Sequence, residues 1–197
     1  MRISSEEEGL GCQSVYRVIG VLNGDVRFYL NDTEEKYTDE EFQFDTVLTG
    51  SGALAVHADR KDLHYETDTK DIDLYANSEI ADLETFESFP HTERTREDGS
   101  QLCYDTTSAS TSVEAPEAFV DVITDYRKAF NWRDDDAKEV HRLLEQETDR
   151  NEPIARGPVN VHLPSLETLK KTFEYSDLDY NARVEMIEKM QAEKRTQ

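Results

Sequence analysis

Long apolar runs, cysteines and turn-forming residues are all scarce in this sequence. No apolar stretch approaches the ~20 residues that a helix needs to cross a membrane, which excludes an ordinary membrane span. Segment 1–8 is acidic and has no apolar signal core, so we expect a cytoplasmic protein. Cys12 and Cys103 stand in no partner motif, which favours free thiols in a reducing compartment. We find neither an internal repeat nor a flexible linker.

Motifs for several common enzyme classes are also missing. The five histidines show no zinc-binding spacing with the two cysteines. There is no serine-nucleophile motif and no dinucleotide-binding fingerprint. The acidic run 134–136 lacks the glycine and the distal glutamate of a calcium loop, so we interpret it as a solvated helix start.

Positive charge is in short supply. The chain has 22 Lys and Arg against 44 Asp and Glu, a formal net charge of −22, and the acids are spread along its length. Such a surface repels phosphate backbones, which favours a protein that avoids or mimics nucleic acid. Dense carboxylates also keep a protein hydrated and soluble, which favours adaptation to a high-salt cytoplasm. The excess of Arg over Lys resembles a haloarchaeal composition and favours the second interpretation. Because the Debye length falls to about 3 Å near 1 M salt, charge alone does not exclude a nucleic-acid substrate.

The order of helical and strand patterns predicts an α/β (α+β) fold, in which a mixed β-sheet is flanked by helices. The expected helices are 6–30, 51–58, 77–86, 134–146, one capped by Ser165, and 181–194. The expected strands are 46–49, 70–75, 101–104, 119–124 and, at a sheet edge, 159–163. We expect an N-terminal helical and acidic extension at 1–45, a main domain at 46–169, and a C-terminal helical segment at 170–197 packed on the domain or trailing it.

The most informative feature is a glycine-rich turn between a buried strand and a helix. Residues 47–57 contain this pattern, with Gly50, Ser51 and Gly52 at the turn. Small residues let the backbone approach a phosphate, and the first N–H groups of a helix favour an anion.

A pair of acids follows on the next predicted strand. Asp71 and Asp73 share one strand face because side chains alternate, while Ile72 and Leu74 face the core. Asp121 lies in another apolar strand and is a candidate third carboxylate. Magnesium prefers oxygen ligands and takes one or two carboxylates together with phosphate and water. The combination predicts metal-dependent phosphoryl chemistry.

Simpler interpretations stay open for each of these residues. Gly50 and Gly52 could merely end a strand tightly. Asp71 and Asp73 could form the solvated face of an edge strand, although their apolar neighbours favour a central one. Asp121 could equally be an exposed strand residue.

In this order the residues resemble the nucleotidyltransferase fold of the DNA polymerase β superfamily, and most of all the minimal nucleotidyltransferases and abortive-infection toxins of toxin–antitoxin systems. The likeness covers about residues 46–169 and rests on segments 49–54, 69–74, 119–123 and 159–169. It departs from the pattern in two places. The distance from turn to acids is longer, so 59–66 is an expected insertion, and Thr67 stands where many relatives carry an arginine.

The resemblance implies a metal-dependent enzyme that moves a nucleoside monophosphate from a nucleoside triphosphate (NTP) to a hydroxyl group of RNA, protein or a small molecule. Asp71, Asp73 and Asp121 would hold Mg²⁺ or Mn²⁺, with Asp121 as third ligand or general base. The nucleotide would be bound by Gly50, Ser51, Gly52 and Lys70. An antitoxin-like protein partner is implied, and a membrane is not. The alternatives are an inactive interaction module of the same fold, from a virus or mobile element, or an acidic nucleic-acid mimic.

Overall fold

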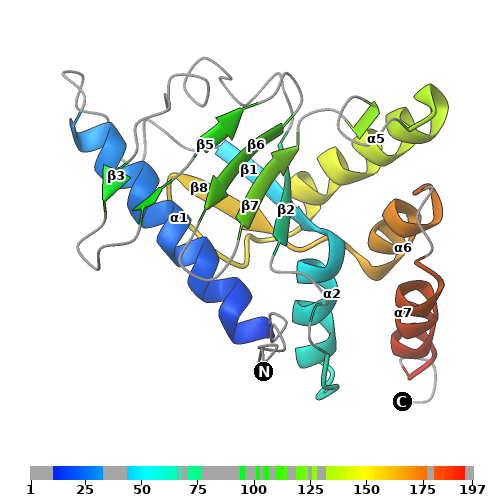
Figure 1. The fold of residues 1–197 in the computed structure, drawn as a ribbon. Helices are drawn as coiled ribbons and strands as arrows, with labels where there is room; N and C mark the ends of the chain where they lie inside the picture. Colours follow the sequence, from blue (N-terminus) through cyan, green and yellow to red (C-terminus); the bar gives the residue numbers. More distant parts are fainter. Residues whose placement is uncertain are drawn as a thin grey trace, which may run out of the picture.

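In the computed structural model a six-stranded mixed sheet is flanked by helices, as the sequence predicts (Figure 1). The structure describes residues 11–32, 44–65, 67, 71–76, 94–95, 101–102, 104–106, 110–114, 119–123, 126–127, 132–176 and 180–193. The helices are α1 (Cys12–Asp32), α2 (Gly50–Asp59), α5 (Asp134–Arg150), α6 (Leu166–Glu174) and α7 (Asn181–Glu193). The strands are β1 (Phe44–Thr49), β2 (Asp71–Ala76), β3 (Arg94–Thr95), β4 (Gln101–Leu102), β5 (Tyr104–Thr106), β6 (Ser110–Glu114), β7 (Phe119–Ile123) and β8 (Val159–His162).

The main sheet has the strand order β5-β6-β7-β2-β1-β8, and a separate pair joins β3 to β4. Strand β2 is central: it runs antiparallel to β1 and parallel to β7. Strand β8 lies at the edge, as predicted, parallel to β1. The predicted helix 77–86 lies outside the described residues. None of the described helices is long and apolar enough to span a membrane.

Among the strands that were not predicted from the sequence, β6 is the longest. Segment 110–114 is rich in Ser and Thr and shows no apolar alternation, yet it forms β6 and pairs with β7 along all five residues. The pairing partner, not the composition of the segment, makes it a strand, because β propensity depends strongly on sheet context.

The two faces of the sheet are covered by two separate cores. Leu48, Ile72 and Leu74 belong to the larger core, to which α1, α2, α6 and α7 contribute. Val47 and Tyr75, their neighbours in sequence, belong to the second core with α5. In Figure 1, α1 and α5 accordingly lie on different sides of the sheet, and α6 and α7 stand beside α2. This alternation places Asp71 and Asp73 on the face of the second core.

Helix α2 is the central helix of the larger core. Its residues from Ser51 to Val56 are all buried, as is Ala58. A helix without a polar face is typical of a fully buried position. Because α2 is buried, its orientation in the protein is fixed. Its first turn therefore lies at the end of β1, beside β2.

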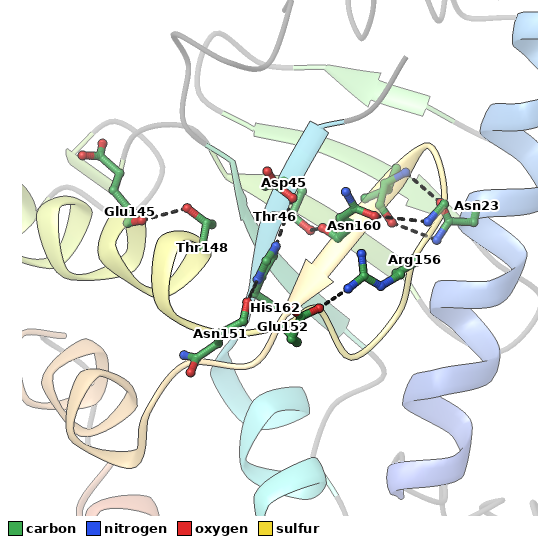
Figure 2. Close-up of polar contacts among 12 residues, drawn as sticks. Asn23, Asp45, Thr46, Glu145, Thr148, Asn151, Glu152, Arg156, Asn160 and His162 are labelled. Atoms are coloured by element: carbon green, nitrogen blue, oxygen red, sulfur yellow. Dashed lines mark hydrogen bonds and ion pairs between the residues drawn. The ribbon is translucent and has the colours of Figure 1, made fainter. Parts of the chain in front are cut away.

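Polar side chains secure the edge strand β8. Asn23 of α1 donates from Nδ2 to the Val159 carbonyl (3.0 Å) and accepts from the Val159 N–H (2.8 Å), as a neighbouring strand would. His162 lies between Asp45, 3.0 Å from Nε2, and the Asn151 carbonyl, 2.7 Å from Nδ1 (Figure 2). The Asn23 contacts satisfy backbone groups that an exposed edge leaves unpaired, and the His162 contacts tie β8 to β1 and to the segment after α5.

Candidate active site

The sheet register brings the three predicted acids to neighbouring positions. Asp73 of β2 is paired directly with Asp121 of β7, and Asp71 is paired with Phe119. Paired residues of adjacent strands lie on the same face, and so do residues two apart on one strand. The backbone positions of Asp71, Asp73 and Asp121 therefore lie close together on one face of the sheet. Asp73 is half-buried, and the side chains of Asp71 and Asp121 lie outside the described part of the chain.

Gly50 is the point where the backbone comes closest to this area. It has φ +61°, in the left-handed region that glycine adopts without strain. A Cβ at this position would overlap the Oδ2 atom of Asp73. Both observations require glycine here, so the turn brings the start of α2 directly against the Asp73 carboxylate.

A short hydrogen-bond chain holds the end of β1 in place. The Tyr126 hydroxyl donates to Thr49 Oγ1 (3.0 Å), which donates to the Asp73 carbonyl (3.3 Å). Because Thr49 is engaged in this way, its side chain does not cap α2. Burial raises the pKa of the Tyr126 phenol, with the Asp73 charge adding to the effect. The phenol therefore stays protonated and remains a donor.

A pocket of about 60 Å³ opens at this point. One side is formed by the strand ends and the turn, the other by aromatic residues and the α6–α7 region. The lining residues are Thr49, Gly50, Asp73, Ile123, Tyr126, Trp132, Thr172, Phe173, Ser176, Tyr180 and Arg183. Tyr126 stacks on Trp132, with ring centroids 4.7 Å apart, which fixes the aromatic wall.

Most of this wall was not predicted from the sequence. Tyr126 and Trp132 come from the segment after β7, and Arg183 comes from α7, far along the chain. No local motif marks these residues, because their position depends on how α5, α6 and α7 pack. The only signal in the sequence is the concentration of aromatic residues near 126–132 and 173–180.

The predicted nucleotide-binding residues are found in different settings. Gly50 lines the pocket, while Ser51 and Gly52 are buried behind it in the first turn of α2. Lys70 lies outside the described residues. Thr67 is 3% exposed, so this position faces the protein interior. Within the described residues, no three His, Cys, Asp or Glu side chains gather as a metal site.

A second and much larger hollow lies at the other end of α2. This groove, of about 1070 Å³, is bounded by α2, α6 and α7. Its lining includes Arg60, Lys61, Lys170 and Lys171, a concentration of cations in an acidic chain. His57 also lines it, with Nε2 2.7 Å from the Pro164 carbonyl, and burial lowers the pKa of this imidazole.

Comparisons with known proteins show a similarity at the level of the fold. No protein-family model matches the chain, and no curated protein matches it. Among solved structures, the chain is similar to a Thermotoga maritima protein described as a candidate nucleotidyltransferase. The two share 14% sequence identity and a TM-score of 0.40, over 96% of this chain and 98% of the other.

Proposed function

We propose that this protein is a metal-dependent nucleotidyltransferase, which transfers a nucleoside monophosphate from an NTP to a hydroxyl group. The observation that carries the proposal is the direct pairing of Asp73 with Asp121, with Asp71 two residues away on the same face. Like charges at neighbouring positions of a sheet interior repel each other, and a bound cation offsets that cost.

The donor set suits magnesium. Asp71, Asp73 and Asp121 offer carboxylate oxygens, which magnesium and manganese prefer over nitrogen and sulfur. Half-burial of Asp73 beside the Gly50 backbone limits how many waters can solvate this carboxylate. When bound, the metal would supply charge neutralisation for the phosphate oxygens.

The residues of the turn have a role in binding the triphosphate. The start of α2 faces the acids, and the Thr49 side chain does not cap it. Its first N–H groups, at Gly50, Ser51 and Gly52, carry the positive end of the helix dipole. Lys70 directly precedes β2, and its ammonium group would add a positive charge for the phosphates.

In the proposed reaction, the acceptor oxygen bonds to the α-phosphorus while the bond from that phosphorus to its bridging oxygen breaks. Pyrophosphate leaves with the electron pair. The hydroxyl proton passes to Asp121 if this residue acts as a general base; as a third ligand, Asp121 would leave the proton to water. In-line positioning and charge stabilisation supply most of the rate in such reactions.

The test uses NTPs labelled at the α-phosphate, Mg²⁺, and total cellular RNA, protein extract or small-molecule acceptors. Label should reach one of these acceptors, and Asp73→Asn should reduce the rate by at least about a thousandfold, since metal binding contributes several kcal/mol. Asp149→Asn, which removes an exposed charge on α5, is the matched control.

The assay is run in dilute and in multimolar salt, because self-repulsion at net charge −22 opposes folding in dilute buffer. A folded protein that labels no acceptor would contradict the proposal. That result would favour an inactive interaction module, or a mimic of nucleic acid if the protein captures a basic partner.

A further inference from the structure

The small pocket beside Asp73 carries opposite charges on its two sides. Of the described residues that line it, Asp73 is the one carboxylate and Arg183 is the one cation; the others are neutral. Its volume of about 60 Å³ is the share of roughly two water molecules in the liquid. A space of this size suits a group of phosphoryl size.

Aromatic rings hold Arg183 at the pocket wall. Its guanidinium carbon lies 4.4 Å from the centroid of the Tyr180 ring and 5.5 Å from that of Phe173. These two rings meet edge to face, with centroids 5.2 Å apart. Stacking fixes the plane of a guanidinium and leaves its in-plane N–H donors to hydrogen bonds. The rings thus orient the guanidinium before a ligand arrives.

The anchoring also ties the C-terminal helix to the candidate site. Arg183 and Tyr180 stand at the start of α7, and Phe173 belongs to α6, whereas Asp73 belongs to the central strand β2. A ligand between Asp73 and Arg183 would therefore contact both the sheet and the C-terminal helices. The part of this ligand that contacts Arg183 must be anionic. The part near Asp73 must contact the carboxylate through a bound cation. A phosphate chain meets both demands.

We propose that Arg183 binds the β- or γ-phosphate of the NTP substrate, an assignment that rests on the proposed function. The guanidinium fork matches two phosphate oxygens, while an ammonium group contacts them as a point charge. Arg183 therefore contributes to tri- and diphosphate binding and leaves the binding of a monophosphate almost unchanged.

The experiment uses the fluorescence of Trp132, the single tryptophan of the chain, which lines the same pocket. ATP, ADP, AMP and inorganic tripolyphosphate are titrated in Mg²⁺ into the wild type, Arg183→Gln and Arg183→Lys. Lys189→Gln, an exposed cation on the same helix, is the matched control. Melting temperatures of all variants are recorded alongside.

We expect Arg183→Gln to weaken ATP and tripolyphosphate binding about ten- to hundredfold, as for a charged hydrogen-bonded pair. AMP binding should change less than about twofold. Arg183→Lys should fall between Arg183→Gln and the wild type, and Lys189→Gln should match the wild type. If Arg183→Gln does not fold, the ratio of ATP to AMP affinity in Arg183→Lys decides the outcome.

Equal losses for ATP and AMP would overturn the assignment, because they indicate a structural role for Arg183. Unchanged ATP binding in Arg183→Gln would also overturn it and leave the proposed function standing. Phosphate binding that depends on Arg183, in a protein that transfers nothing, would contradict the proposed function alone. A wild type that binds neither ATP nor tripolyphosphate would contradict both.

Discussion

The two ends of helix α2 lie beside hollows that differ in size, charge and chemistry. At its start is the pocket of about 60 Å³ with Asp73, and at its end is the groove of about 1070 Å³ with four cations. By volume alone, the groove would be the stronger candidate for a binding site. The arrangement of charge favours the pocket, because the strand pairing places a second acid, Asp121, beside Asp73.

Two of the four cations that line the groove are paired with acids. Lys170 Nζ lies 2.7 Å from Glu188 and 3.4 Å from Glu174, and Lys171 Nζ lies 3.9 Å from Glu139. Such exposed ion pairs are common on protein surfaces and contribute little to stability. Lys170 and Lys171 therefore contribute little net positive charge to the groove.

A buried acid elsewhere sharpens the contrast. Glu147 of α5 is 4% exposed, yet it accepts hydrogen bonds from Asn151 (2.6 Å), the Ser165 N–H (3.0 Å) and the Thr168 hydroxyl. The hydrogen-bond donors to Glu147 belong to the protein itself, and these contacts join α5 to α6. Burial of a carboxylate is thus not by itself a sign of a site. A second carboxylate at the paired position is the stronger indication.

The largest effect should come from the metal. At a Mg²⁺ concentration a hundredfold above Kd, the melting temperature of the wild type should rise by about 5 °C or more. Asp73→Asn should abolish this rise and should raise the melting temperature in metal-free buffer, because it removes repulsion between carboxylates. Scanning calorimetry at matched ionic strength measures both. A rise in Asp73→Asn equal to that of the wild type would place the metal elsewhere.

Gly50 should be intolerant of any side chain. Gly50→Ala should lower the free energy of unfolding by about 1–3 kcal/mol, since alanine at a positive φ is strained and its Cβ overlaps Asp73. Gly20→Ala is the opposite case: Gly20 is exposed in α1 with open space around it, so alanine should stabilise the protein by about 0.5–1 kcal/mol. Denaturant titrations compare the two. Effects of the same sign and size would remove the special role of the turn.

The sequence alone predicted much of the region around the acids. Alternation along Asp71, Ile72, Asp73 and Leu74 placed the acids on one face, and Ile72 and Leu74 are fully buried on the other. The edge strand that Pro164 ends was also predicted, and β8 lies at the edge of the sheet. These are local properties, since side-chain direction in a strand has a period of two.

The opposite wall of the pocket could not be predicted in the same way. Trp132 packs in the core beside α5 and also lines the pocket, and no local pattern marks the second role. Arg183 carries no motif, and its place depends on the packing of α7 against α6. Tertiary contacts of this kind have no local signature. The roles of Asp71, Asp73, Asp121 and Lys70 stay predictions.

Protonation of His57, at the groove end of α2, should lower the stability of the protein. Burial lowers the pKa of His57 below the ordinary value of 6.5, so the unfolded chain binds more protons just below pH 6.5. The contribution to stability is therefore complete above pH 6.5 and is lost as the pH falls toward the folded-state pKa, at no more than about 1.4 kcal/mol per pH unit. His57→Gln should flatten this part of the stability profile, measured by denaturant titration from pH 5 to 7.5. An unchanged slope in His57→Gln would contradict the prediction.

The smallest effect on ATP binding is expected for substitutions in the larger hollow, the groove. Lys170→Gln combined with Lys171→Gln removes two of the four cations that line the groove, yet ATP binding should stay within about twofold of the wild type. The reason is that both ammonium groups already interact with glutamates and are screened by salt, so they contribute little charge to a ligand. The Trp132 titration that tests Arg183 measures this variant under the same conditions. If the double variant weakened ATP binding as strongly as Arg183→Gln, the groove would take part in nucleotide binding. The contrast between the two ends of α2 would then fail, because volume and positive charge would have been the better guides to the site.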